Sequence, residues 1–449
     1  MAGEELLGAL APVLGAREAA PVTGPRSWWG GPLDVEGLAL GAVQAAATAL
    51  SCWREAIGLP GTVTVRSEAV AAAFDSYGLL RVDGAALTAF APLSGFFRAT
   101  DGWVRTHANY PHHAAALRSA LGLTNPAGHA RDAVAAAIGE RSATEIEDAV
   151  VASGGVAAAV RTPAQWRASD PGRHANLAPW IGWSLTKGEP LPVTPGALPL
   201  AGVRVLDLTR VIAGPTATRV LGALGADVLR IDPPHRPEDH GTHLDTGWSK
   251  RSALADLRVP EQGAAVRALI DQADVVVMGY RGGALAPFGL APEVLLERRP
   301  DLIIATLDAW GRTGPWAARR GFDSIVQAAC GIAWQYRQPD DSPGALPVQA
   351  LDHATGYGIV AAVLALLTRR AERGGGGHAH LSLARTAAEL QPWAEPPSTT
   401  VIDPSSDLRE VSTVHGLLRT ARPPLDLDGA ALEHCTPPQR YGTASLAFS

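Results

Sequence analysis

The hydrophobic pattern changes its character along the chain. Residues 1–90 are rich in alanine, and their apolar positions recur at helical spacing, most clearly over residues 38–56. Residues 91–186 combine a strand-like piece at 102–107 with helical patterns at 114–121, 131–138 and 143–152. We therefore expect a helical segment at 1–90, followed by a smaller α/β domain at 91–186.

A proline-rich stretch at 187–200 predicts a linker, and the pattern alternates after it. Short apolar, β-branched runs that predict strands lie at 203–208, 228–231, 275–278 and 302–306. Helical patterns between and after them lie at 217–224, 261–272, 292–297 and 356–373. This alternation predicts βαβ units and an α/β domain with an open, mainly parallel sheet at 201–395. Residues 396–449 form a proline-rich tail with weak periodicity.

Composition narrows the class of protein. A chain of 449 residues is expected to form two or more domains, and a net charge of −6 gives no basic surface for nucleic acid or a membrane. The three cysteines, Cys52, Cys330 and Cys435, are far apart and fit a reducing compartment. The N-terminus lacks the basic flank of a signal peptide, so we expect a soluble, cytoplasmic protein. His107, His112 and His113 have no Cys or Glu at ligand spacing, and we expect no metal site.

One segment of the chain is repeated. At an offset of 316, seven positions from Ala45 to Gly61 match seven positions from Ala361 to Gly377. Upstream, Leu-Asp at 33–34 matches Leu-Asp at 351–352 after a two-residue gap. Both copies have the order Leu-Asp, helix, Arg, glycine turn, strand. This order predicts a partial internal duplication.

Several motifs resemble those of class III (family III) coenzyme A transferases. The opening motif is LAGVRVLDLTRVIAGP at 200–215, followed by LGADVLRID at 224–232. Shorter pieces continue in the family's order: KRS at 250–252, ADVVV at 273–277, GRTGP at 311–315, GFD at 321–323 and QA at 327–328. Residues similar to the family's smaller domain lie upstream, as TDGWVRTH at 100–107, RD at 131–132, ED at 147–148, GGVAA at 154–158 and RTPAQW at 161–166.

The resemblance implies a Rossmann-like large domain and a smaller α/β domain, in the reverse of the usual order. The chain therefore resembles a fused, permuted duplicate that has lost parts of both copies. Family members form interlocked homodimers, with the site between the large and small domains. The resemblance implies the same here, with acyl-CoA and a carboxylic acid as substrates and no tightly bound cofactor.

In the family an aspartate attacks the acyl-CoA thioester, and an aspartyl anhydride and an aspartyl-CoA thioester follow. The matching residue is Asp352, just before the helix predicted at 356–373. A carboxylate suits such a relay because its acyl adducts stay reactive. The alternative is that Asp352 only caps this helix. Asp34, in the truncated copy, is the fallback candidate.

The resemblance also indicates residues for binding CoA. Val211, Ile212 and Ala213 form the turn after the first strand, where a helix N-terminus can receive phosphate. Arg281 and Arg320 are candidates for phosphate or carboxylate, and Tyr280 could stack on adenine. The family usually has Glu-Asn-Phe where this chain has Met-Gly-Tyr at 278–280. Its glycine loop is expected before Thr100, where the chain has only Leu-Ser-Gly at 93–95.

The main functional hypothesis is CoA transfer from an acyl-CoA to a carboxylic acid through Asp352. A non-catalytic partner or scaffold protein that has kept the fold is one alternative. An acyl-CoA racemase or isomerase is another, and it needs two acid/base groups on opposite faces of the substrate. Related racemases have His-Asp where this chain has Phe-Asp at 322–323. His353 would then have to serve as the second group.

Overall fold

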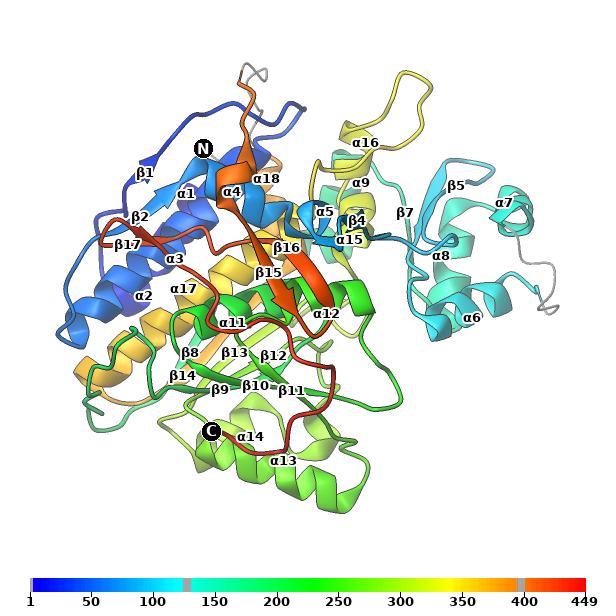
Figure 1. The fold of residues 1–449 in the computed structure, drawn as a ribbon. Helices are drawn as coiled ribbons and strands as arrows, with labels where there is room; N and C mark the ends of the chain where they lie inside the picture. Colours follow the sequence, from blue (N-terminus) through cyan, green and yellow to red (C-terminus); the bar gives the residue numbers. More distant parts are fainter. Residues whose placement is uncertain (1–2, 124–130, 393, 395–399) are drawn as a thin grey trace.

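The computed structural model describes residues 3–123, 131–392, 394 and 400–449, and it shows a mixed α/β protein (Figure 1). Its largest sheet has seven strands in the order β11-β10-β9-β12-β13-β14-β8. The strands are β8 (Gly182–Leu185), β9 (Arg204–Leu208), β10 (Asp227–Asp232), β11 (Arg251–Leu254), β12 (Val275–Met278), β13 (Ile303–Asp308) and β14 (Gly377–Ser382). All neighbours pair in parallel except β8, which is antiparallel to β14 at one edge. The sheet is thus mixed and mainly parallel.

Helices cover both faces of this sheet because both faces of its strands are apolar. In β12, Val275 and Val277 contribute to one hydrophobic core, whereas Val276 and Met278 contribute to the other. The first face packs against α11 (Ala213–Ala223) and α17 (Ala350–Arg373). The second face is covered by α13 (Pro260–Gln272) and α14 (Pro292–Arg298) (Figure 1). Strands buried on both faces read as continuous apolar runs, as these do.

The remaining helices of this half surround the sheet and its first core. They are α12 (His240–Thr246), α15 (Asp323–Ala329), α16 (Ile332–Gln335), α18 (Leu383–Leu390) and the short 3-10 helices η2 (Ala286–Phe288) and η3 (Pro404–Asp407). Upstream of the sheet, α9 (Pro163–Ala168) and α10 (Asp170–Leu177) lead into β8, and residues 187–200 contain no helix or strand.

Two long helices lie side by side in the first core: α3 (Val35–Ala56) and α17 (Figure 1). Both are long and apolar enough to span a membrane, but 83% and 100% of their most apolar stretches are buried inside the protein. They are the helices of the internal repeat, and they end alike. Buried Arg54 and Arg370 come near the ends, and Gly58 and Gly374 follow with φ of 73° and 75°. A strand follows each glycine.

The N-terminal segment contains more than helices. Its helices are α1 (Glu4–Ala9), α2 (Ala11–Leu14), α3, α4 (Ser67–Phe74) and α5 (Ser76–Leu79). Its strands are β1 (Val22–Thr23), β2 (Val63–Arg66), β3 (Arg81–Val82) and β4 (Ala85–Ala86). The tail supplies their partners: β15 (Leu408–Thr413), β16 (Gly416–Ala421), β17 (Asp426–Leu427) and β18 (Ala430–Ala431). Two four-stranded sheets result, β1-β2-β17-β18 and β15-β16-β3-β4. The weak periodicity of the tail did not predict these strands.

A smaller α/β unit lies to one side of the main sheet (Figure 1). Its antiparallel sheet consists of β5 (Gly95–Arg98), β6 (Trp103–Thr106) and β7 (Ala157–Ala159). Its helices are α6 (Pro111–Ala120), α7 (Arg131–Gly139) and α8 (Ala143–Ala152). These elements share a core of their own that includes Phe97, Val104, Leu117, Ile138 and Ile146.

Candidate active site

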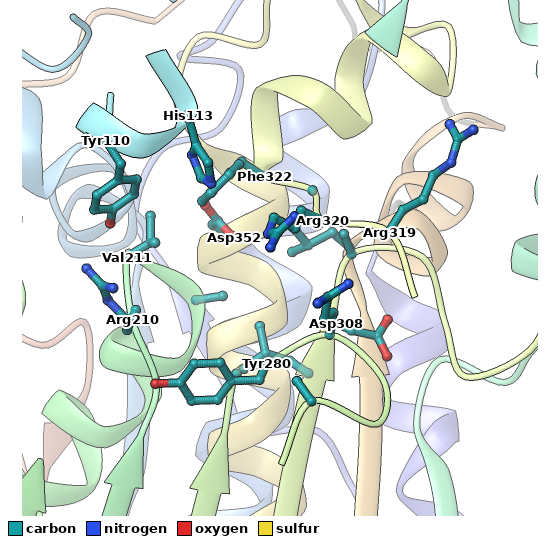
Figure 2. Close-up of a pocket in the computed structure, with 18 of the residues that line it drawn as sticks. Tyr110, His113, Arg210, Val211, Tyr280, Asp308, Arg319, Arg320, Phe322 and Asp352 are labelled. Carbon is teal, nitrogen blue, oxygen red and sulfur yellow. The ribbon is translucent and has the colours of Figure 1, made fainter. Parts of the chain in front are cut away.

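A cavity of about 290 Å³ opens at the carboxyl ends of β9, β12 and β13 (Figure 2). The strand order reverses here, because β10 lies on one side of β9 and β12 on the other. Ligands of open α/β sheets bind at such a switch point. Residues lining this basic cavity include Tyr110, His112, His113, Arg210, Val211, Ala213, Arg236, Tyr280, Arg281, Asp308, Arg319, Arg320, Phe322 and Asp352. Both the small unit and the main sheet contribute to it.

Three arginines of the basic cavity have no acidic partner in the described part of the chain: Arg236, Arg281 and Arg320. Arg281 and Arg320 donate hydrogen bonds to the carbonyl oxygens of Ala318 and Gly154, both at 3.2 Å. Burial lowers the pKa of Arg320, and the charges of Arg281 and Arg236 lower it further. Three guanidinium groups without an acidic partner among the described residues favour an anionic ligand such as a phosphate ester.

The other two arginines are already paired. Arg210 contacts Glu238 at 3.4 Å, and Arg319 pairs with Glu147 at 2.9 Å. Figure 2 shows the Arg319 side chain pointing away from Asp352.

The turn after β9 is held in an unusual conformation. Val211 has φ of 70°, a left-handed value that is a genuine outlier for a β-branched residue. Its N–H donates to a carboxylate oxygen of buried Glu238 at 2.9 Å. Glu238 also accepts from Arg230 at 2.9 Å and from the Tyr110 hydroxyl. Burial opposes ionisation of Glu238, but Arg230 and Arg210 lower its pKa to about 2. This anchored carboxylate fixes the Val211 backbone beside the cavity.

A second buried network supports the same turn from below. The Lys250 ammonium group donates to Asp207 at 3.2 Å, to the Pro215 carbonyl at 3.0 Å and to Thr218 at 2.7 Å. It thereby ties the end of β9 to the first turns of α11. Burial lowers the pKa of Lys250 to about 8, although Asp207 opposes the shift. Lys250 belongs to the KRS motif that resembles the family, a motif to which we had assigned no role. Its hydrogen bonds join two elements of the fold.

Asp352 lies in the first turn of α17, which begins at Ala350. We predicted this residue just before the helix, and that boundary was wrong by a few residues. The cap is instead provided by Asp323, whose carboxylate accepts the Asp352 N–H at 3.0 Å and also bonds the Leu351 N–H. Asp352 is therefore not needed as the helix cap. Its carboxyl group lines the cavity in the middle of Figure 2.

Burial and the neighbouring Asp323 carboxylate both raise the pKa of Asp352 well above its ordinary value. Burial also raises the pKa of Asp323 to about 6, although hydrogen bonds from Gln327 and the helix N–H groups oppose the shift. Two carboxyl groups this close do not ionise independently. Perturbed pairs of this kind cluster at functional sites.

A glycine on α17 sets how closely this helix approaches the Val211 turn. A Cβ at Gly356 would lie 2.6 Å from the Ala213 carbonyl oxygen and 3.1 Å from Thr216 Cβ. Only glycine permits this contact between α17 and the start of α11. Asp352, one helical turn earlier, lines the same cavities as Val211.

Asp352 also lines a second cavity, of about 230 Å³. We call it the aromatic cavity, and its lining includes Phe74, Asp75, Tyr77, Ala89, Phe90, His107, Ile212, Phe322, Asp323, Val348, Asp352 and His353. Val211, Phe322 and Asp352 line both cavities. Asp352 thus stands at the junction of a basic cavity and an aromatic one.

The structure brings most of the predicted site residues together. Val211, Ala213, Tyr280, Arg281 and Arg320 line the basic cavity with Asp352. Ile212 lines the aromatic cavity instead. Asp34 lines neither of the two; it caps α3, where its carboxylate accepts the Gly37 N–H at 2.8 Å.

Sequence reasoning did not find Tyr110, Arg236, Glu238 and Asp323. None lies at a motif position that we had linked to a role at the site. Asp323 was noted only as the partner of a missing histidine. Three-dimensional contacts, not spacing, define these residues.

Two of the three histidines at which we expected no metal site are packed against aromatic rings. His107 stacks on Phe322 with ring centroids 3.7 Å apart, and His113 lies edge-on to Tyr110. Burial lowers the pKa of both histidines to about 3, so they are uncharged at neutral pH. They form an uncharged wall of the site.

Comparison with known proteins identifies the large domain. Residues 200–406 match the model of CoA-transferase family III. A probable fatty acyl-CoA transferase of Mycobacterium tuberculosis is 34% identical over 214 residues, which cover 45% of this chain and 54% of that protein. A succinate–glutarate CoA-transferase of Agrobacterium fabrum is 36% identical over 203 residues, covering 41% and 51%. A solved Mycobacterium tuberculosis structure shares 35% identity over 43% of this chain and 56% of that one, with a TM-score of 0.41.

Residues 200–406 of the chain are thus similar to CoA-transferase family III. The resemblance of the sheet domain is therefore confirmed. The chain spans about half the length of the curated relatives it matches. The likeness of residues 100–166 to the family's smaller domain lies outside the match and stays a prediction.

Proposed function

We propose that the protein transfers CoA from an acyl-CoA thioester to a carboxylic acid, with Asp352 as the nucleophile. One observation carries the proposal: a buried carboxyl group that is not the helix cap lies where two cavities meet. One cavity is aromatic, and the other holds three arginines that have no acidic partner among the described residues. CoA carries phosphate groups at one end and the reactive thioester at the other. The arginines suit the phosphate groups, and the buried carboxyl group suits the thioester.

CoA is placed along the carboxyl edge of the sheet. Its phosphates would bind Arg236, Arg281 and Arg320. A further cavity of about 320 Å³ beside the basic one shares Arg210, Arg236 and Tyr280 with it and is lined by Leu257 and Phe288. This cavity would take the adenine end, next to the Tyr280 ring. The thioester would then reach Asp352.

The reaction is balanced without any redox partner. An Asp352 carboxylate oxygen attacks the thioester carbonyl carbon, the C–S bond breaks and CoA thiolate leaves, which forms an acyl–aspartyl anhydride. The thiolate attacks the aspartyl carbonyl carbon, and the donor acid leaves as its carboxylate. The acceptor carboxylate then displaces thiolate from the aspartyl-CoA thioester. The thiolate finally attacks the acceptor carbonyl of this second anhydride, which gives the new acyl-CoA and restores Asp352.

The nucleophile must be ionised for the first step. The N-terminus of α17 favours the anion, whereas burial and Asp323 disfavour it. A carboxylate with little solvation is more reactive once it forms, and its raised pKa means that it forms only at a higher pH than for an ordinary carboxyl group. The site therefore holds a reactive carboxylate at the cost of a harder ionisation.

The test is mass spectrometry of the intact protein after incubation with acyl-CoA donors and hydroxylamine, which converts an aspartyl anhydride or thioester into a hydroxamate. We expect a single mass increase that peptide mapping assigns to Asp352. Asp352→Asn should show none, and Asp34→Asn, the matched change in the other copy, should behave as the wild type. Modification at Asp34, or none with any donor while CoA fails to bind, would overturn the proposal and favour a scaffold role.

The racemase alternative is weaker. His353 does line the aromatic cavity beside Asp352. However, both residues come from the same turn of α17, and racemisation needs groups on opposite faces of the substrate. Burial also lowers the pKa of His353 to about 3. Such a histidine is a poor proton acceptor.

Three broader features belong to the same proposal. The order of the six parallel strands along the sheet is third, second, first, fourth, fifth, sixth, which supports a Rossmann-like domain. A homodimer follows from the family resemblance, and we base a cytoplasmic location on the three widely spaced cysteines.

A further inference from the structure

We propose that the aromatic cavity holds the acyl group, and that it selects acyl groups with an apolar, uncharged body about the size of a phenyl ring. This inference rests on the proposed function, because Asp352 must receive the acyl group. It adds a substrate class to the reaction and assigns specificity to residues 74–90.

Aromatic rings line much of the cavity, together with the polar side chains of Asn109, Thr242, Ser324 and Gln349. Phe74, Tyr77 and Phe90 come from the N-terminal segment, whereas Phe322 and Val348 come from the part of the chain that forms the seven-stranded sheet. Phe74 is firmly held, because its ring stacks on Tyr357 with centroids 5.7 Å apart and an interplanar angle of 8°. Aromatic surfaces placed this way favour a flat or branched apolar group.

The size of the cavity agrees with this class. An apolar cavity of about 150 Å³ is known to bind benzene. The aromatic cavity, at about 230 Å³, has room for a phenyl ring with one or two further carbon atoms. A long acyl chain would not fit inside this volume and would have to extend out of the opening of the cavity.

The charges around the cavity disfavour an acyl group with a second carboxylate. None of the described residues that line it is Lys or Arg, whereas Asp75, Asp323 and Asp352 are acidic. The Arg105 guanidinium lies 5.0 Å from the ring centroids of both Phe90 and Phe96, but Arg105 is not part of the lining. A dicarboxylic acyl group would place its second charge among carboxyl groups.

The residues that line the N-terminal side of the aromatic cavity lie outside the region that matches the family model, residues 200–406. Phe74, Tyr77, Ala89 and Phe90 precede residues 200–406 by more than a hundred positions. The partial copy at the N-terminus therefore does more than fill the core with α3. It closes the half of the site that faces the acyl group.

The test compares single-turnover acylation of Asp352 by phenylacetyl-CoA and by succinyl-CoA, each read as the hydroxamate. We expect phenylacetyl-CoA to react at least about tenfold faster. Ala89 is exposed in the loop that lines the cavity. Ala89→Lys supplies the missing cation and should shift the ratio about tenfold toward succinyl-CoA. The matched control is Ala86→Lys, on exposed β4 outside the lining, which should leave the ratio unchanged.

A second variant removes an aromatic wall. Phe90 is 38% exposed, so Phe90→Ala should fold normally and should slow phenylacetyl transfer about tenfold while changing the succinyl rate little. Equal rates for both donors in the wild type, or a ratio unmoved by Ala89→Lys and Phe90→Ala, would overturn the inference. Such a result still shows acylation of Asp352, so it differs from failure of the proposed function, in which no donor gives an adduct.

Discussion

At the scale of single residues, the site combines groups that are costly to bury. Asp352 and Asp323 are nearly inaccessible carboxyl groups, and each raises the cost of ionising the other. Val211 has a strained backbone conformation, which is held by a hydrogen bond to Glu238. Glu238 in turn accepts a hydrogen bond from Arg230. Strained and perturbed residues of this kind concentrate where a fold trades stability for function.

Asp352→Asn should therefore raise the Tm at pH 8. The pKa of Asp352 is higher in the folded protein than in the unfolded chain, so the folded state loses stability as pH rises through that higher pKa. The amide removes this loss, and the gain should amount to a few degrees at pH 8 and shrink at pH 5. Differential scanning fluorimetry at both pH values measures it. A lower Tm for the variant at pH 8 would contradict the pKa shift.

At the scale of elements, the junction of α17 with α11 decides the position of Asp352. The Gly356 backbone touches the Ala213 carbonyl, and no side chain fits between them. Gly358, in the same helix, faces the flexible end of Leu381, which can move. The two glycines make a matched pair.

Gly356→Ala should destabilise the protein by about 1–3 kcal/mol, because the new methyl group must push the two helix backbones apart. It should also slow acylation of Asp352. Gly358→Ala should be nearly neutral, since higher helix propensity, worth about 1 kcal/mol, offsets the adjustment of Leu381. Urea unfolding of both variants measures the difference. Equal stabilities would show that the close contact does not control α17.

Much of the element pattern was predictable from sequence. The strand predicted at 275–278 and the helix at 143–152 match β12 and α8, because apolar runs and caps are local signals. The start of α17 was placed six residues late. Its first turn is capped by Asp323 from α15, a contact that the local sequence of α17 does not contain. The candidate nucleophile was found through a family motif, whereas its partner Asp323 needed the structure.

At the scale of the whole molecule, three distant parts of one chain line the two cavities. Tyr110 and His113 of the small unit, Phe74 and Phe90 of the N-terminal segment, and Asp352 of the sheet half meet around the two cavities. The tail was the least predictable part. Its short strands pair with strands more than 300 residues earlier, and no local pattern specifies such partners.

Acylation of Asp352 should therefore not depend on association of chains. Diluting the enzyme from micromolar to nanomolar concentration should leave the single-turnover rate constant unchanged, even if a homodimer dissociates. Mass photometry gives the oligomeric state at each concentration. A rate constant that falls with the dimer fraction would show that a second chain completes the site.

The packing of α3 against α17 has a consequence for folding during synthesis on the ribosome. The start of α3 leaves the ribosome 315 residues before the start of α17, as their first residues, Val35 and Ala350, show. At about 5–20 residues per second, the delay is about 15 to 60 s. For that time the long apolar helix α3 lacks its largest neighbour. We therefore expect a nascent chain of this design to bind a chaperone at its N-terminal end until translation reaches the second helix.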